Sequence, residues 1–153
     1  MSAILKRYQQ LSRLPAGNYL FSKAVGFSAP FFAKIHPYVV DLREGYCEVR
    51  MRDRRSVRNH LGTINAGALC SLAEMTGGMA LDSMVPSNMR WIPRGMTVAY
   101  LAKATGTIRG ITELQPDAIQ PGDIVVPVKV YDEENTLVSV SYTHLTLPTN
   151  TTG

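Results

Sequence analysis

The most constraining feature of this 153-residue sequence is a long apolar stretch in its middle, from Asn65 to Leu81. Small and aliphatic residues fill most of it, and Glu74 is the only charged residue between Arg58 and Asp82. A helix that is apolar almost all round has to be surrounded by other parts of the protein. The sequence therefore predicts a helix over about residues 66–84 at the centre of the fold.

Shorter segments with the alternation of strands lie on both sides of this helix. Two strands are predicted before it, at 38–42 and 46–51, and four after it, at 96–102, 106–114, 123–131 and from 137 onward. Two helical segments come first, at 4–14 and 19–35, the second interrupted at Pro30. This order predicts an α+β fold in which an antiparallel sheet is wrapped around one long central helix, with extra N-terminal helices.

The chain length suits one domain that buries a sizeable core. We expect a single domain over residues 1–142, with the N-terminal helices at 1–35 and the sheet and central helix at 36–142. Residues 143–153 hold five threonines in a stretch that no longer alternates. They are predicted to be a non-native or disordered tail, a genuine polar C-terminus being the alternative.

Composition excludes several classes of protein. The two cysteines, Cys47 and Cys70, form no CxxC motif and have no metal-like spacing to the three histidines, which argues against zinc sites and disulfide scaffolds and fits a reducing cytoplasm. No apolar run approaches a membrane-spanning length, and residues 1–14 lack the apolar core of a secretory signal. We expect a cytoplasmic protein without membrane insertion, metal or other cofactor.

The formal net charge is +4, and the densest basic cluster holds five arginines between Arg50 and Arg58. Such a cluster suits an anion, either nucleic acid or the phosphates of a nucleotide-bearing cofactor, and it is equally typical of a solvated strand end. No aromatic platform or recognition motif accompanies it, which argues against nucleic acid.

Glu74 stands out because transferring a carboxylate into apolar surroundings costs several kcal/mol unless it is paired or solvated. Enzymes use such carboxylates in clefts as general bases and nucleophiles. The alternative is a residue on the solvent-exposed side of an amphipathic helix.

The residues before Glu74 carry a resemblance to a known family. The segment reads Asn59-His-Leu-Gly-Thr-Ile-Asn-Ala-Gly67, and the acid follows seven residues after its last glycine. It resembles the hot-dog thioesterases of the phenylacetyl-CoA (PaaI-like) type, whose usual pattern is Asn-x-x-Gly-Thr-x-His-Gly-Gly-x-x-x-x-Leu-x-Asp. The positions that match are Asn59, Gly62, Thr63, Gly67 and Leu72, with Glu74 in the place of the acid.

The resemblance spans about residues 36–140, and the segment Met96–Ala104 looks like the family's third strand. Two departures occur: Asn65-Ala66-Gly67 replaces His-Gly-Gly, and the acid is Glu rather than Asp. The first departure points to an uncharacterised branch that is labelled only as a domain of unknown function.

The resemblance implies an acyl-CoA thioesterase. Glu74 would act as general base on water, or as nucleophile. The backbone N–H of Gly67 or of Ala66 would polarise the thioester carbonyl at the helix N-terminus. Asn59 or Asn65 would position water or substrate, although Asn65 is equally suited to be a helix N-cap and Asn59 to hold its loop.

The resemblance also implies an assembly and a ligand. Glu74 lies roughly 10–12 Å along the helix from its N-terminus, too far for both groups of one subunit to act together. The family solves this with a dimer, so we expect a homodimer or a dimer of dimers that binds an acyl-CoA or acyl-carrier thioester. Arg94 and Lys103 are candidates for contacts to the CoA phosphates. An acyl tunnel is expected along Leu69, Leu72, Met75 and Met79, unless these residues are simply core.

Two other functions stay open. A hydroxyacyl-thioester dehydratase pairs a histidine with an acid, and His60 precedes Glu74 by fourteen positions. However, the His-Phe-Pro-Gly-His signature of that family is missing, and the spacing from glycine to acid differs. A non-catalytic hot-dog protein that binds an acyl-CoA or acyl-carrier ligand fits the loss of His-Gly-Gly. Hydration of an enoyl thioester would identify the first, and a retained ligand without turnover the second.

Overall fold

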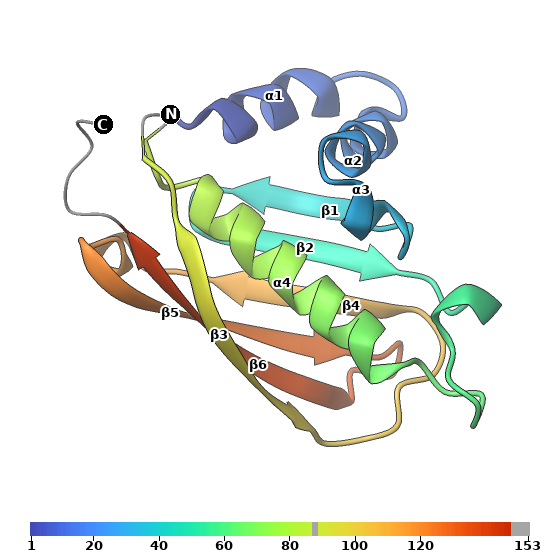
Figure 1. The fold of residues 1–153 in the computed structure, drawn as a ribbon. Helices are drawn as coiled ribbons and strands as arrows, with labels where there is room; N and C mark the ends of the chain where they lie inside the picture. Colours follow the sequence, from blue (N-terminus) through green and yellow to red (C-terminus); the bar gives the residue numbers. More distant parts are fainter. Residues whose placement is uncertain (87–88, 148–153) are drawn as a thin grey trace.

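The computed structural model of the chain describes residues 1–86 and 89–147 (Figure 1). Six antiparallel strands form one sheet in the order β1-β2-β4-β5-β6-β3, which confirms the predicted α+β architecture. The strands are β1 (Tyr38–Arg43), β2 (Tyr46–Met51), β3 (Ile92–Tyr100), β4 (Ile108–Glu113), β5 (Gly122–Tyr131) and β6 (Leu137–Leu147). The α-helices are α1 (Ala3–Ser12), α2 (Gly17–Ser28), α3 (Pro30–Ala33) and α4 (Ala66–Asp82), and short 3-10 helices cover Arg55–Val57 and Pro116–Ala118.

The central helix, α4, begins and ends at residues whose side chains bind its free backbone groups. Asn65 is the N-cap, and its Oδ1 accepts a hydrogen bond from the N–H of Gly67. At the other end Ser83 donates to the carbonyl of Ala80 and accepts from the N–H of Gly45, which ties the helix to the turn between β1 and β2. The predicted helix over 66–84 is therefore confirmed, with its end at Asp82.

Glycines let α4 lie directly on the sheet. A Cβ atom at Gly77 would stand 3.0 Å from Val126 Cγ1, and one at Gly110 would stand 2.9 Å from Thr76 Oγ1. Leu72, fully buried between them, contributes about 1.5–3 kcal/mol through the hydrophobic effect. Close packing of helix on sheet thus explains why small residues occupy this face.

The strand β3 starts at Ile92, four residues before the predicted start at Met96. Pro93 lies inside it, and proline is normally excluded from strands because it has no N–H to donate. The strand is at the edge of the sheet and, within residues 1–86 and 89–147, pairs only with β6, with a register shift between Pro93 and Gly95. A strand at the edge of a sheet has a neighbour on one side only, so a residue without an N–H is accepted there.

The prediction of a disordered tail from residue 143 is wrong for residues 143–147. These residues form the second half of β6, which pairs with β3 on one side and β5 on the other. Leu145 and Leu147 are 2% and 1% exposed, so this half of the strand belongs to the core. The remainder of the predicted tail, 148–153, lies outside the described residues.

The N-terminal helices cover the opposite edge of the sheet, above β1 in Figure 1. The Asn18 amide donates to the carbonyls of Val39 and Val40 at 3.1 and 2.9 Å, and Ser22 Oγ accepts from the N–H of Val39 at 2.8 Å. Side chains of α2 thus bind the outer backbone groups of β1.

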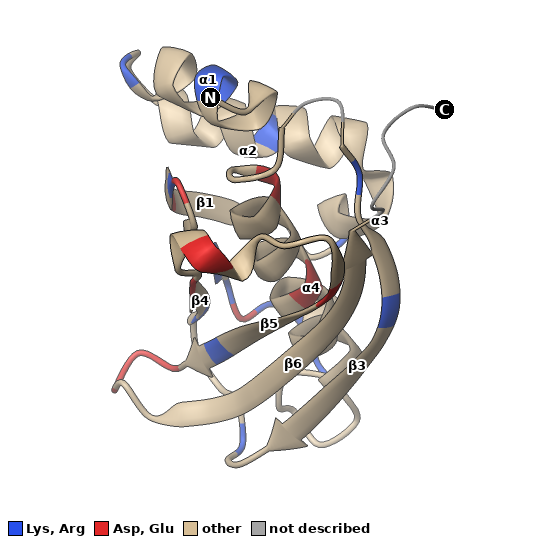
Figure 2. Ribbon diagram, turned by 90° about the vertical axis from the view of Figure 1, so that its left-hand side faces the viewer, with Lys and Arg blue, Asp and Glu red and all other residues tan. Residues whose placement is uncertain are grey.

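Strands β3 and β6 curve past α4 at the other side of the molecule and carry few charges (Figure 2). Arg94 is the only lysine, arginine or acid in β3, and β6 has none. Among the described residues, no helix is long and apolar enough to cross a membrane.

Candidate active site

Glu74 lies in the middle of the least buried row of α4. The neighbouring positions along this row are Cys70, one turn before, and Gly78, one turn after. Glu74 is partly exposed, whereas most of the helix is buried. Within the described residues its carboxylate makes no hydrogen bond and no ion pair, so the charge is free to act on a ligand or on water.

This row faces the strand β3. At one end the Tyr100 hydroxyl lies 3.1 Å from Cys70 Sγ. At the other end the Trp91 ring packs on Gly78, where a Cβ atom would stand 3.1 Å from it, and Trp91 Nε1 donates to Asp82 Oδ1 at 2.6 Å. Glu74 therefore lies between two contacts that join α4 to the open edge of the sheet.

The same contacts shift two pKa values. The hydrogen bond to Cys70, with burial in second place, raises the pKa of Tyr100 to about 12. Burial raises the pKa of Asp82, and the hydrogen bond from Trp91 acts in the opposite direction. Tyr100 is therefore a neutral hydrogen-bonding group at physiological pH.

The N-terminus of α4 borders a second feature, a cavity of about 280 Å³. Asn65, Gly67 and Ser71 line it from the start of α4, Lys34 lines it from the residue after α3, and Arg58, which is paired with Asp53, lines it from the loop after β2. Helix N-termini favour developing negative charge because their first N–H groups lack partners within the helix. The site residues near Gly67 are thus gathered around a space that a small group can enter.

Only one of the two predicted N–H donors is without a partner among the described residues, and it is not the one that lines the cavity. The Gly67 N–H is already bound by the Asn65 side chain at 2.6 Å. The Ala66 N–H has no acceptor among the described residues. The Ala66 N–H is therefore the free one of the two, although Ala66 itself does not line the cavity, and Asn65 takes the N-cap position.

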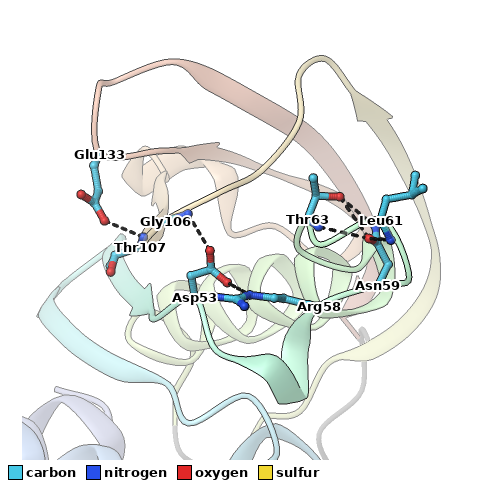
Figure 3. A network of polar contacts seen from close by, with 8 residues as sticks. All are labelled: Asp53, Arg58, Asn59, Leu61, Thr63, Gly106, Thr107 and Glu133. Atoms are coloured by element: carbon cyan, nitrogen blue, oxygen red, sulfur yellow. Dashed lines mark hydrogen bonds and ion pairs between the residues drawn. The ribbon is translucent and has the colours of Figure 1, made fainter.

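Asn59 is engaged by its own loop, as Figure 3 shows. Its Oδ1 accepts from the N–H groups of Leu61 and Thr63, and its Nδ2 donates to Thr63 Oγ1 at 2.9 Å. The structure thus places Asn59 as the residue that shapes the turn before α4. His60, in the same turn, is exposed.

Asp53, also drawn in Figure 3, joins this loop to the sheet through hydrogen bonds. Asp53 accepts from Arg58 Nε at 2.6 Å and from the Gly106 N–H at 2.9 Å. The hydrogen bond from Arg58 is the largest of the effects that lower the pKa of Asp53. The carboxylate is thereby kept ionised where it joins the loop before α4 to the start of β4.

The predicted substrate contacts are not brought together. Leu69 and Met75 are buried in the core, as are Leu72 and Met79, and none of these lines the cavity at the N-terminus of α4. Arg94 lies on β3, where its Nε donates to Thr146 Oγ1, and Lys103 is exposed beyond the end of that strand.

The sequence analysis missed two hydroxyls on the inner face of β6. Ser141 Oγ and Thr143 Oγ1 are buried and have no hydrogen-bond partner among the described residues. Thr143 pairs with Met96 of β3 and with Val126 of β5, the residue that packs on Gly77. Unpaired buried hydroxyls are rare, so these two polar groups stand out on the inner face of β6. The alternation of β6 was the available signal.

Among the described residues, no group of three or more histidine, cysteine, aspartate or glutamate side chains is placed to hold a metal ion.

Comparison with known proteins agrees with this architecture. Residues 17–147 match the family described as Domain of unknown function (DUF4442), and the chain belongs to that family. No curated protein matches the sequence. The chain is 39% identical to a genomics target known from a crystal structure, covering 96% of this chain and 99% of that one, with a TM-score of 0.85.

Two further crystal structures are similar. One is a protein of unknown function from Pseudomonas aeruginosa, called a probable thioesterase, at 26% identity, with 88% of this chain and 96% of that chain covered and a TM-score of 0.76. The other is a thioesterase from Haemophilus influenzae at 17% identity, with 76% and 81% covered and a TM-score of 0.69. At that identity the likeness concerns the fold alone. The fold is the hot-dog fold of thioesterase-like proteins, as the resemblance in the sequence predicted.

Proposed function

We propose that this member of the DUF4442 family hydrolyses an acyl thioester of coenzyme A or of an acyl carrier protein. The observation that carries the proposal is the partly exposed Glu74 carboxylate, which has no partner among the described residues and lies on the side of α4 that faces the open edge of the sheet. The name of the similar Pseudomonas aeruginosa protein, a probable thioesterase, supports the same class of reaction.

In the proposed reaction, Glu74 removes a proton from a water molecule as the water oxygen attacks the thioester carbonyl carbon. The carbonyl oxygen gains negative charge, which the Ala66 N–H and the positive end of α4 stabilise. The carbon–sulfur bond then breaks, and the proton held by Glu74 passes to the leaving thiolate. A carboxylic acid and a free thiol are released.

One subunit does not bring these two groups together. Eight residues separate Ala66 from Glu74, or about 12 Å along the helix axis. We propose a homodimer in which Glu74 of one subunit faces the helix N-terminus of the other. The support is β3: seven of its nine residues are exposed, and it pairs on one side only. An open edge strand of this length is suited to pairing with a second copy.

The proposal is tested by measuring thiol release from a panel of short, medium, long-chain and aromatic acyl-CoA thioesters. Glu74→Gln keeps the size of the side chain and removes its basicity. We expect kcat/KM to fall by about 10²–10⁴. Glu134→Gln is the matched control, because Glu134 is an exposed acid in the β5–β6 turn whose side chain makes no hydrogen bond. Turnover that survives in Glu74→Gln would contradict the proposal.

A second function is favoured by one observation. The Asn65 side chain occupies the Gly67 N–H, in the segment where the family pattern has His-Gly-Gly. A site that keeps one donor instead of two would stabilise the developing charge less well and would suit a protein that binds acyl thioesters without hydrolysing them. Absence of thiol release across the whole panel, from a folded protein that binds the same thioesters, would establish this function instead.

A further inference from the structure

A second cavity, larger than the one at the N-terminus of α4, lies away from that helix. It has a volume of about 800 Å³ and is lined by α2, α3, the start of β1, and β2 with the loop that follows it. No residue of α4 contributes to it. Its size is in the range of cavities that hold small molecules and cofactors. The N-terminal helices that form one wall are the part of the chain outside the resemblance to the thioesterases.

Positive charge is concentrated in this cavity. Lys23 comes from α2, and Arg50, Arg52 and Arg54 come from β2 and the loop after it. No aspartate or glutamate lines the cavity, and none of these four side chains forms an ion pair among the described residues. Like charges held together without a counter-charge repel each other, so the arrangement favours an anion with more than one negative charge.

His36, which lines the same cavity, has a pKa that responds to these positive charges. Partial removal from water and then the charges of Arg54 and Lys23 lower its pKa. Its backbone has φ +50°, a left-handed conformation that is uncommon outside glycine and costs free energy. Residues held in such conformations cluster at ligand-binding sites.

Aromatic side chains form the rest of the wall. Arg50 is stacked on the Tyr38 ring, with 4.6 Å between the guanidinium carbon and the ring centroid, and this contact fixes the guanidinium at the cavity. Tyr19 and Phe27 lie on the α2 side, and Phe27 is 89% exposed. An exposed aromatic ring beside a cluster of cations is suited to stack on a planar ring that is attached to phosphates.

We propose that this cavity binds a nucleoside diphosphate, with its phosphates on the cluster of Lys23, Arg50, Arg52 and Arg54 and its base on the aromatic wall. A single phosphate would leave most of the four cations without a partner, whereas a diphosphate can contact several of them. The same chemical group occurs in a free nucleotide and in the nucleotide end of coenzyme A. The inference does not depend on thioester hydrolysis.

Calorimetric titration of ADP into the full chain at low salt tests the proposal. We expect saturable binding that weakens at high salt, no binding of adenosine, and binding of pyrophosphate at least about tenfold weaker than that of ADP. Phe27→Ala should weaken the binding of ADP and leave the binding of pyrophosphate unchanged. Absence of ADP binding at millimolar concentration, or equal binding of ADP and pyrophosphate, would overturn the proposal.

The arginine run supplies a matched pair of variants. Arg54 lines the cavity, whereas its neighbour Arg55 is exposed and does not. Arg54→Gln should weaken ADP binding at least about tenfold, and Arg55→Gln should leave it unchanged, because charge-assisted contacts to phosphate need the side chain at the site. Both variants should unfold at the wild-type temperature. An equal loss of ADP affinity in the two variants would show that ADP is attracted by the net charge of the surface, and would overturn the proposal that it binds in this cavity.

Competition distinguishes the two sources of the nucleotide. If the cavity holds coenzyme A, coenzyme A displaces ADP, and in Arg54→Gln the KM for an acyl-CoA rises while kcat stays constant. If it holds a free nucleotide, coenzyme A does not displace ADP and KM is unchanged. Either result supports the cavity as a nucleotide site. ADP binding is measured without turnover, so a chain that hydrolyses no thioester still gives a decisive result.

Discussion

The sheet has two edges, and the chain covers one of them and leaves the other open. At β1, Asn18 and Ser22 of α2 bind the outer carbonyls and N–H of the strand. At β3, seven of nine residues are exposed, and among the described residues no element pairs with the outer side. Exposed strand edges promote association, so proteins usually cover or charge them.

The two edges of the sheet carry different candidate sites. The covered edge carries the large basic cavity, which the covering helices create. The open edge is joined to α4 by Tyr100 and Trp91, on either side of Glu74. We therefore expect substitutions on β3 to change association and activity, and substitutions in the contacts between α2 and β1 to change stability.

The largest effect is expected from a charge on the open edge. Ala99→Glu places a carboxylate on the exposed β3 of both subunits, and we expect the dimer to dissociate about 100-fold more readily, because like charges brought together at an interface cost several kcal/mol. Sedimentation velocity over a concentration series measures this. The same change at Ala24, which is exposed on α2, is the control. Equal association of the two variants would show that β3 is not the interface.

Removing one hydrogen bond at the covered edge should destabilise the fold. Ser22→Ala leaves the buried N–H of Val39 without its acceptor, at a cost of about 1–3 kcal/mol in the free energy of unfolding. Urea denaturation measures the loss. Ser28→Ala, at the exposed end of the same helix, should have little effect. A destabilisation as large in Ser28→Ala would mean that helix formation, and not the edge contact, is being measured.

Trp91→Phe tests the anchor between the open edge and α4, and its effect depends on pH. Burial raises the pKa of Asp82 in the folded protein, and Trp91 opposes this, so the substitution raises that pKa further. A carboxyl whose pKa is higher when folded favours the folded state more as it becomes protonated. The loss of stability, about 1–3 kcal/mol at neutral pH, should therefore shrink as the pH falls through the folded pKa.

Asp82→Asn in the Trp91→Phe background is the control for this pH dependence. The double variant is compared with Asp82→Asn alone. Neither contains the carboxyl whose titration is invoked, so the difference in stability between these two should be independent of pH in this range. Chemical denaturation at pH 4, 5, 6 and 7 gives the comparison, with these values chosen to bracket a raised carboxyl pKa. A loss of stability in Trp91→Phe that grows as the pH falls would contradict this explanation.

The smallest effect is expected at the other anchor. The pKa of Tyr100 is raised to about 12, chiefly by its hydrogen bond to Cys70. Cys70→Ala should lower that pKa toward the ordinary tyrosine value and leave stability nearly unchanged, because the contact is exposed. Ultraviolet difference titration measures the change, with Tyr100→Phe to identify the signal. An unchanged titration would remove Cys70 as the cause.

Local sequence patterns predicted the elements of the fold but not their positions at edges. The apolar stretch around Glu74 was enough to predict α4. Pro93 led to a late start for β3, since nothing local to the sequence shows that a strand will be at an edge, where proline is accepted. The threonines after Tyr142 obscured an alternation in which Thr143, Leu145 and Leu147 face the core.

The sites depended on contacts between residues far apart in the sequence. The sequence singled out Glu74 as the one charge in an apolar stretch, and its role stays a prediction; its partial exposure follows from the packing around α4 and not from a local pattern. The arginine run was read as one cluster. The structure divides it, because Asp53 binds Arg58 while Arg50, Arg52 and Arg54 line a cavity together with α2 and α3. No local pattern predicts that packing.

We propose that each site uses Glu74 of one subunit and the Ala66 N–H of the other, and mixing two inactive variants tests this arrangement. Glu74→Gln removes the base. Ala66→Pro removes the N–H at a position where helices accept proline, and Asn65 before it already has the extended backbone, φ −65° and ψ 141°, that precedes proline. Each variant alone should be inactive.

Unfolding and refolding the two variants together forms mixed dimers in which one of the two sites contains both intact groups. The account predicts recovery of about one quarter of the wild-type rate of thiol release in an equimolar mixture, because half of the dimers are mixed and each has one working site. If the mixture stays as inactive as its components while each variant remains a folded dimer, the site does not cross the subunit interface and the account is contradicted.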